Sequence, residues 1–263
     1  MSTNPTGLDP YKPSEIAVLV EAAGVVKARL PAVQMATLAI LAGLFIGLGA
    51  AAFTQAMTGV DAAAGPFRIL GGMVFSLGLI LVVVGGAELF TGNALMVMAA
   101  VDRRISLSEL GRSWLIVYMG NLAGAVALAL AFSGSGVLSG AVGQTAVSIA
   151  EAKVALGPVE AFVRGILCNM LVCLAVWLAL AARTVTGKIL AILWPITSFV
   201  ALGLEHSVAN MYLLPQGLLA GAAIGPGAIV QNLVLVTLGN IIGGAGGVAL
   251  TYRLAYGPAK PAP

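Results

Sequence analysis

Charged residues are scarce in this chain. Asp, Glu, Lys and Arg make up only 9% of its 263 residues, whereas hydrophobic residues make up 60%. A soluble domain carries about 25% charged residues, and a helix needs about 20 apolar residues to cross a bilayer. This composition therefore excludes a water-soluble domain and predicts an all-α integral membrane protein. The stretches without any charged residue are 30–60, 69–87, 113–150, 165–182, 189–204 and 206–252.

Histidine and cysteine are nearly absent as well. His206 is the only histidine, and Cys168 and Cys173 are the only cysteines. One histidine cannot supply both ligands of a haem in a membrane anchor, and two cysteines at this spacing form neither a metal site nor a disulfide framework. The chain also lacks His-Glu-x-x-His, phosphate-loop and nucleophile motifs. We therefore expect no metal, no cofactor, no nucleic-acid partner and no enzymatic activity.

The N-terminus lacks the features of a secretory signal, which has a short apolar core followed by a small-residue cleavage site. Basic residues instead flank a mildly amphipathic stretch, and the first long apolar run begins at Pro31. We predict a cytoplasmic arm with a short helix at the membrane surface over 1–30. The remaining sequence is predicted to form one transmembrane domain over 31–254 and a short cytoplasmic tail over 255–263.

Turn-rich linkers, the longest over 133–157, divide the apolar sequence into six expected crossings. With the N-terminus inside, ten of the thirteen basic residues fall on the cytoplasmic side, and only Arg68, Lys153 and Arg164 lie on or near the other side. This bias predicts two cytoplasmic termini in the inner (cytoplasmic) membrane. The six crossings are expected near 31–57, 67–101, 110–132, 158–182, 188–213 and 229–253.

The second and fifth crossings each contain an interruption. The stretch "GGAELFTGN" (85–93) breaks the second crossing, and "GLEHSVAN" (203–210) breaks the fifth. Irregular backbone at membrane depth is tolerated only where protein or a water-filled cavity covers it. Both segments are therefore predicted to face the interior of the bundle.

The two interruptions belong to an internal repeat. Both contain Gly-x-Glu-x-x-x-x-Asn, and farther along each half carries Gly-Asn-x-x-Gly, at 120–124 and 239–243. This order predicts a duplicated unit of three crossings, the second inverted because three is odd. Inverted repeats with broken helices mark a substrate path near the midplane, and helix N-termini there favour anions. The Gly-x-x-x-Gly spacing also predicts close contact between helices.

Each polar residue at the interruptions has either a structural or a functional role. Glu88 and Glu205 either cap the backbone freed at the break or bind a cation, and their matched positions favour the structural role. Four asparagines either form hydrogen bonds between helices or line the path: Asn93, Asn121, Asn210 and Asn240.

His206 has no counterpart in the first half, where Leu89 stands in its place. An ionisable side chain inside a membrane is a functional candidate by default. Histidine is also the side chain that changes charge near physiological pH. We therefore expect His206 to act in permeation or gating.

Taken together, these motifs resemble those of the formate/nitrite transporter family. The resemblance rests on residues 71–93, 165–177, 203–212 and 237–244 and covers nearly the whole chain. It implies a homopentamer in the lipid bilayer whose protomers have an aquaporin-like fold, each with its own pore. The substrates it implies are small monovalent anions such as formate, nitrite, hydrosulfide and short carboxylates.

The resemblance also implies roles for individual residues. Thr91 and His206 match a pair that can form a hydrogen bond, where movement of the loop is linked to gating. Lys153 matches a vestibule lysine that attracts the anion, and Asn169 and Asn240 match polar pore positions. The N-terminal arm resembles one that gates the cytoplasmic mouth. Four apolar side chains match constrictions above and below a central chamber: Phe75, Leu79, Phe90 and Phe199.

Formate is the favoured substrate, because "FSLGLIL" (75–81) resembles the formate-channel branch, although "AELFTGN" also occurs in nitrite-type branches. A bare anion would lose its hydration at the apolar constrictions. Proton transfer from His206, or from water relayed by it, would let the neutral acid pass, and formate would move with a proton at low pH. Nitrite is the alternative within the family. A neutral-solute channel is disfavoured because Asn-Pro-Ala is absent from both breaks, and a redox anchor because a second histidine is missing.

Overall fold

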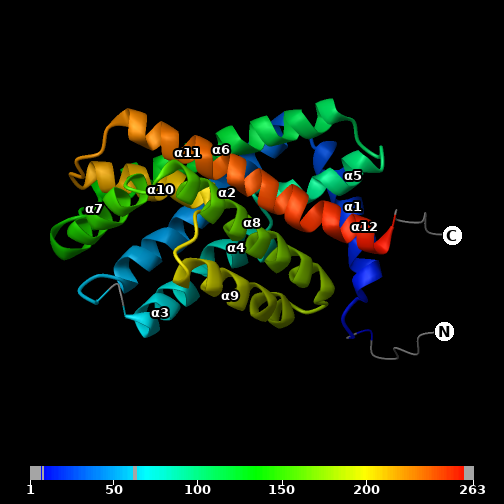
Figure 1. Cartoon of the computed structure of the whole chain (residues 1–263), viewed down its shortest axis with the longest axis horizontal. Coiled ribbons are helices and arrows are strands. Elements are labelled where there is room, and N and C mark those ends of the chain that lie inside the picture. The colour runs from blue at the N-terminus through cyan, green and yellow to red at the C-terminus, as the bar shows by residue number, and fades with distance from the viewer. Residues whose placement is uncertain (1–6, 8, 62–63, 258–263) are drawn as a thin grey trace.

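A computed structural model describes residues 7, 9–61 and 64–257 of the chain. Throughout these ranges the regular elements are helices, and no strand occurs. Most of the predicted arm is described, except for 1–6 and 8, whereas 258–263 of the predicted tail lie outside the described residues. The first and last helices, α1 (Pro13–Ala28) and α12 (Thr251–Tyr256), pack against each other at one end of the bundle (Figure 1).

Five helical segments of the described chain are long and apolar enough to cross a membrane. This finding confirms an all-helical, multi-pass membrane protein. The segments are α2 (Ala32–Ala56), α3 with α4 (Gly65–Phe75 and Leu77–Gly85), α6 (Leu107–Gly134), α8 (Pro158–Ala181), and α11 with the π-helix η2 and α12 (Pro226–Ile241, Ile242–Leu250 and Thr251–Tyr256). The remaining predicted crossing, over 188–213, consists of two shorter helices, α9 (Val185–Ala201) and α10 (Ser207–Leu219).

Both interruptions lie where the sequence predicts them. The helix α4 ends at Gly85, and the next residue, Gly86, has a φ of 85° that suits glycine. The chain resumes as a short 3₁₀ helix, η1 (Gly92–Met96), followed by α5 (Val97–Val101). In the other half α9 ends before Gly203, which has a φ of 69°, and α10 begins at Ser207. Each broken crossing thus contains a few residues of irregular backbone, 86–91 in the first half and 202–206 in the second, that lead into the bundle.

Residues 140–154 form a helix, α7 (Gly140–Val154), so the prediction of a turn-rich linker over the whole of 133–157 is wrong for this part. The turn signals of "SGSGVLSG" (133–140) hid the spacing of small residues that follows. Gly143, Ala146 and Ala150 face inward at helical spacing and are buried, and α7 packs against α10 and α11.

The helix predicted in the N-terminal arm is present as α1, but it lies against the protein. Its buried residues include Ile16, Val20 and Glu21, and it packs against η1, α5 and α8. A carboxylate oxygen of Glu21 lies 3.2 Å from the Arg104 guanidinium, which fastens α1 beside the start of α6. The arm is therefore part of the folded bundle from residue 13 onward.

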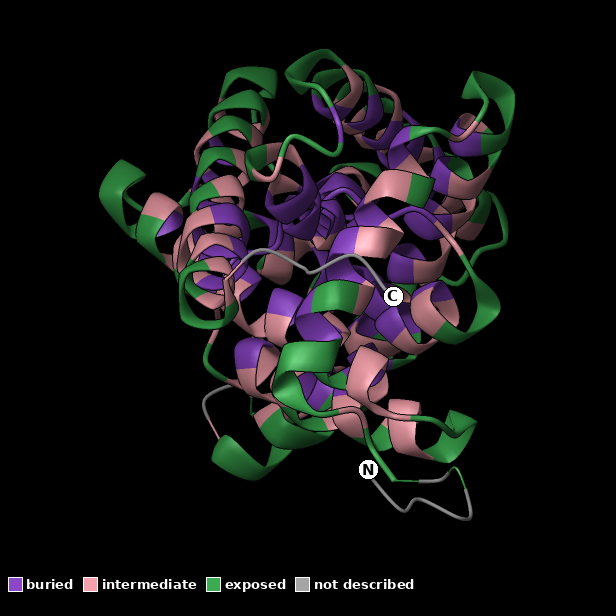
Figure 2. Cartoon of the chain, turned by 90° about the vertical axis from the view of Figure 1, so that its right-hand side faces the viewer, coloured by how far each residue is buried: buried purple, intermediate pink, exposed green. Residues whose placement is uncertain are grey.

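The glycine motifs bring two pairs of helices into close contact. A Cβ atom on Gly124 would overlap the carbonyl of Ile40, which joins α6 to α2. In the other half a Cβ atom on Gly243 would overlap the carbonyl of Ile166, which joins η2 to α8. These contacts confirm the close approach that the spacing predicts. Buried residues gather at the centre of the bundle (Figure 2), and several polar ones among them belong to the candidate site.

Candidate functional site

One asparagine holds the first interruption in place. Asn121, on α6, is fully buried. Its Oδ1 accepts a hydrogen bond from the backbone N–H of Phe90 at 2.9 Å. Its Nδ2 donates to the carbonyls of Glu88 at 2.9 Å and of Ala39, on α2, at 2.8 Å. One side chain therefore satisfies backbone groups that the broken helix leaves without partners.

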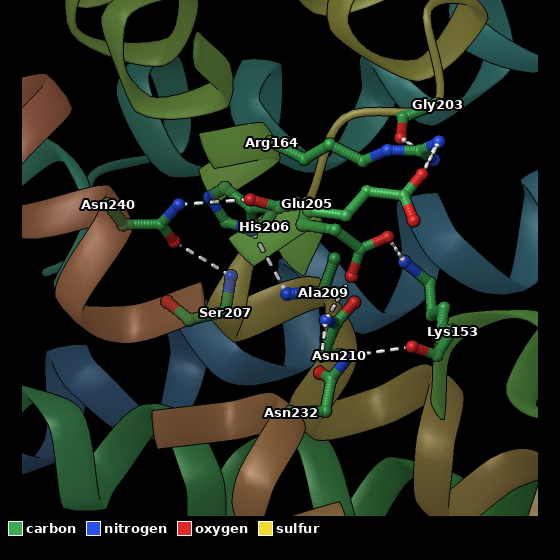
Figure 3. A network of polar contacts seen from close by, with 11 residues as sticks. Lys153, Arg164, Gly203, Glu205, His206, Ser207, Ala209, Asn210, Asn232 and Asn240 are labelled. Carbon is green, nitrogen blue, oxygen red and sulfur yellow. Dashed lines mark hydrogen bonds and ion pairs between the residues drawn. The ribbon is translucent and has the colours of Figure 1, made fainter. Parts of the chain in front are cut away.

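The second interruption is held in the same way by Asn240, on α11 (Figure 3). Its Oδ1 accepts from the backbone N–H of Ser207 at 2.8 Å. Its Nδ2 donates to the carbonyls of Glu205 at 2.9 Å and of Gly165, on α8, at 2.8 Å. In both halves the asparagine thus binds the carbonyl of the glutamate, the N–H two residues later, and a carbonyl of the first long helix of that half. The asparagine of each Gly-Asn-x-x-Gly motif is fully used by backbone groups.

The two glutamates form matched ion pairs. Glu88 accepts from Lys27 Nζ at 2.9 and 3.0 Å and from Asn93 Nδ2 at 2.8 Å. Glu205 accepts from Lys153 Nζ at 2.9 Å and from Asn210 Nδ2 at 2.7 Å (Figure 3). In each pair a lysine ammonium occupies the position that a bound cation would take. The geometry therefore favours the structural reading of both carboxylates over the cation-binding one.

Lys27 was not identified from the sequence, although a signal for it exists. It stands near the end of α1 and shortly before Pro31, as Lys153 stands near the end of α7 and shortly before Pro158. The two short helices thus occupy corresponding places in the two halves. The correspondence depends on the helix α7, which the turn-rich pattern of 133–157 does not predict.

At the centre, the two broken crossings meet through one hydrogen bond. Thr91 Oγ1 and His206 Nε2 lie 2.9 Å apart, and both residues are buried. The Nδ1 atom of His206 accepts from the backbone N–H of Ala209 at 3.0 Å, so the imidazole caps the N-terminus of α10. An Nδ1 that accepts carries no proton, and His206 is therefore the neutral Nε2–H tautomer that donates to Thr91. The structure brings together the pair that the resemblance implies.

The carbonyl of Thr91 is held by another buried asparagine, Asn169. Asn169 Nδ2, on α8, donates to this carbonyl at 3.1 Å and to the carbonyl of Asn240 at 2.6 Å. Its Oδ1 is buried and has no hydrogen-bond partner among the described residues. The Sγ of Cys173 lies 3.5 Å from the same Thr91 carbonyl. Asn169 thus supports the segment that carries Thr91.

Two cavities approach this centre from opposite breaks. The first, of about 380 Å³, reaches from Lys27 and Glu88 to Leu79 and Leu89. We call it the Lys27 cavity.

The second, the Lys153 cavity, has about 370 Å³ and reaches from Lys153 and Glu205 to Phe75, Phe199 and His206. The rings of Phe75 and Phe199 meet edge to face at 5.5 Å between centroids. Phe75, Leu79 and Phe199 are nearly fully buried and belong to one hydrophobic cluster. Leu79 lines the Lys27 cavity, and the two phenylalanines line the Lys153 cavity.

Phe90 lies elsewhere. Its ring packs edge to face on Tyr118 at 4.9 Å and on Trp114 at 5.9 Å between centroids, both on α6. Leu89, which stands at the position of His206 in the first half, lines the Lys27 cavity beside Leu79. Adjacent residues of an irregular segment point in different directions, and no periodicity in the sequence distinguishes them.

Residues 14–254 match the sequence model of a known family, described as formate/nitrite transporter. The chain belongs to the formate/nitrite transporter family. It is 39% identical over 267 residues to the formate channel FocA of Escherichia coli (strain K12). The aligned region covers 93% of this chain and 94% of that protein. The family members that it matches are channels and transporters, and the chain is accordingly a transporter of this family and not an enzyme.

Solved structures of family members agree with the fold. One, described as an FNT family ion channel, superposes with a TM-score of 0.86 at 32% identity and covers 92% of this chain and 98% of its own. Another, a pentameric formate channel with formate bound, has a TM-score of 0.79 at 38% identity and covers 86% of this chain and 97% of its own.

Proposed function

We propose that this member of the formate/nitrite transporter family carries formate, together with a proton at low pH, through a path between the Lys27 and Lys153 cavities. The observation that carries the proposal is the contact between Thr91 and His206 at the point where the two cavities approach each other. A relative that is 39% identical is a formate channel, and a similar solved structure has formate bound. Formate is small enough to fit such a path.

The architecture that we propose has six crossings in an inverted three-plus-three repeat, as in an aquaporin-like protomer. The matched hydrogen bonds of Asn121 and Asn240 support the repeat. The fifth crossing is assembled from α9 and α10, which are too short to span the membrane separately. The matched ion pairs extend the repeat to α1 and α7. We therefore place α1 with the transport domain, although its sequence lies in the predicted arm.

We further propose a homopentamer in the inner membrane with both termini in the cytoplasm. The pentameric arrangement is that of the formate channel whose structure is similar. The cytoplasmic termini follow from the distribution of basic residues. In this orientation the Lys27 cavity opens to the cytoplasm, and the Lys153 cavity opens to the other side. The packing of α1 beside the Lys27 cavity agrees with a gate at the cytoplasmic mouth.

Three apolar side chains form the barrier along the proposed path: Phe75, Leu79 and Phe199. A formate anion loses hydration there without gaining a hydrogen-bond partner, and this desolvation is costly. Formic acid has no net charge and crosses such a barrier at a much lower cost. We propose that the anion is protonated at the centre, beside His206 and the free Oδ1 of Asn169.

The tautomer of His206 sets a condition on the proton transfer. Neutral His206 already carries its proton on Nε2, so a second proton must bind Nδ1. That proton would displace the N–H of Ala209 and remove the cap of α10, which is worth about 1 kcal/mol. Charge on the imidazole is therefore coupled to movement at the start of α10, and through Thr91 to the loop of the other half.

Nitrite is the second candidate substrate, because it is also a small monovalent anion and the family accepts both. A neutral-solute channel and a redox anchor remain less favoured on the residues given above. In this proposal Leu89 and Lys153 line the two cavities of the path, Lys153 while paired with Glu205, and Phe90 packs on α6. We place Asn240, Glu88, Glu205, Asn93 and Asn210 among the groups that hold the broken helices.

The experiment is uptake of radiolabelled formate by proteoliposomes, with empty liposomes as the control for passive leak of the acid. Unlabelled formate and nitrite are added separately as competitors. We expect protein-dependent uptake that saturates and that formate inhibits at lower concentrations than nitrite. Stronger inhibition by nitrite would move the assignment to nitrite. Uptake no faster than in empty liposomes, from protein that remains folded and pentameric, would overturn the proposal.

A further inference from the structure

Two cationic side chains line the cavities without a carboxylate partner. Lys188 lines the Lys27 cavity, and Arg68 lines the Lys153 cavity. Neither side chain makes an ion pair or a side-chain hydrogen bond within the ranges that the structure describes. Both are half-buried, so their charge is close to the cavity and only partly hydrated.

The two residues occupy corresponding places in the two halves. Arg68 is the fourth residue of α3 (Gly65–Phe75), and Lys188 is the fourth residue of α9 (Val185–Ala201). Each of these helices opens a broken crossing. Each cavity therefore contains a lysine–glutamate pair from one half of the chain and a single unpaired cation from the other half.

Helix stability does not explain this placement. A positive charge near a helix N-terminus opposes the helix dipole, which favours acidic residues there. Neither α3 nor α9 has an acidic residue in its first turn that would offset the charge. Both helices thus carry a cation near the end where it contributes least to folding, and both cations face a cavity.

The balance of charge singles out the same two residues. In the Lys27 cavity the charged lining residues are Lys27, Glu88 and Lys188, and the first two form an ion pair, so one positive charge remains. In the Lys153 cavity Lys153 pairs with Glu205, and Arg164 pairs with Glu160 outside the lining. Arg68 is the cation left over there.

We propose that Arg68 and Lys188 capture the anion at the two mouths of the path, whereas the paired lysines Lys27 and Lys153 hold the broken helices. The inference rests on the proposed transport of a small anion. The field of an ion pair falls off faster with distance than that of a single charge, so the unpaired cations dominate the potential that an approaching anion meets. Low-dielectric cavity walls focus this potential and raise the rate of capture.

The test compares Arg68→Gln, Lys188→Gln and the double variant with the wild type in proteoliposomes. Initial rates of radiolabelled formate uptake are measured against formate concentration at ionic strengths of about 0.01 M and about 0.15 M, where the Debye length is about 30 Å and about 8 Å. We expect the half-saturating concentration of the double variant to rise roughly three- to tenfold at the lower ionic strength, with the maximal rate nearly unchanged. The difference shrinks at the higher ionic strength because salt screens the charge.

Charge-conserving and remote variants serve as controls. Arg68→Lys and Lys188→Arg keep the charge and are expected to keep the wild-type half-saturating concentration and salt dependence. Arg103→Gln removes an exposed charge that lines neither cavity, and it is expected to change neither quantity.

The outcomes separate this inference from the proposed function. If the wild type shows no protein-dependent formate uptake, the proposed function fails. If the wild type transports formate and the double variant keeps the same half-saturating concentration and salt dependence, anion capture by Arg68 and Lys188 is wrong. A loss of maximal rate at unchanged half-saturation, reproduced by Arg68→Lys and Lys188→Arg, would likewise contradict it and indicate a structural role.

Discussion

Thr91 and His206 join the two halves of the chain at the centre of the bundle, with Thr91 Oγ1 2.9 Å from His206 Nε2. The threonine lies in the first interruption and the histidine at the end of the second. The same imidazole caps α10 through its other nitrogen. A change at either residue therefore reaches both broken crossings.

The contact between these residues can be removed with little change of volume. Thr91→Val keeps the shape of the side chain but leaves the Nε2–H of His206 without a partner in a buried site. We expect a loss of about 1 to 2 kcal/mol of stability and a lower Tm in detergent. Thr91→Ser keeps the hydroxyl and is the control. A Thr91→Val protein with the Tm of the wild type would show that the contact does not hold the loop.

The two asparagines of the Gly-Asn-x-x-Gly motifs should each be indispensable to folding. Asn121→Leu and Asn240→Leu each remove three hydrogen bonds and leave buried backbone groups unpaired, at about 1 to 3 kcal/mol for each group. We expect little folded pentamer from either variant, measured by size-exclusion chromatography in detergent. Gln231→Leu is the matched control, because Gln231 is exposed on the same helix as Asn240. Normal yield of pentamer from both asparagine variants would contradict the structural role.

Glycine positions at the helix contacts should not accept a methyl group. Gly124→Ala and Gly243→Ala place a Cβ atom onto a backbone carbonyl of the facing helix, so the helices must separate. We expect a clear fall in Tm for both. Gly134→Ala and Gly246→Ala lie in the same helical segments with open space around the new atom, and they should keep or raise the Tm. Equal Tm values in all four variants would refute the close contacts.

The ion pair between Lys27 and Glu88 can be tested by a double-mutant cycle. Lys27→Gln leaves the carboxylate of Glu88 buried without its cation, at a cost of about 3 kcal/mol or more. Adding Glu88→Gln removes the unpaired charge, and we expect the double variant to regain much of the lost Tm. Additive losses in the double variant would mean that the two residues act independently.

Much of the fold could be predicted from the sequence, because the bilayer and the backbone impose strict requirements. Uncharged runs mark the long helices, and glycine with glutamate in the middle of an apolar run marks each break. The repeated Gly-x-Glu-x-x-x-x-Asn motif identified two sets of residues that form matched hydrogen bonds. Both breaks and the burial of the polar groups agree with those predictions. The contact between Thr91 and His206 agrees with what the family resemblance implies.

Other features depend on contacts that no periodicity encodes. The sequence does not predict the helix α7, because glycine and serine precede a short run of small residues, a pattern that is also typical of loops. Lys27 pairs with Glu88, 61 residues away, and only the fold brings them together. The directions of Leu89 and Phe90 follow from local backbone angles in an irregular segment. Lys153, which the resemblance implies to be a vestibule cation, lines a cavity, and its charge is paired with Glu205.

The central claim is that formate crosses with a proton transferred at His206, and His206→Asn tests it most directly. Asparagine is a good N-cap residue, so it can keep the bond to Ala209, but it cannot accept a proton near neutral pH. Proteoliposomes with a trapped pH dye and radiolabelled formate report protons and formate in the same sample, with empty liposomes correcting for passive leak. We predict that, after subtraction of the leak, the wild type acidifies the interior in step with formate uptake, and that His206→Asn lowers the leak-corrected acidification per formate toward zero. An unchanged ratio of protons to formate in a folded His206→Asn protein would contradict the account.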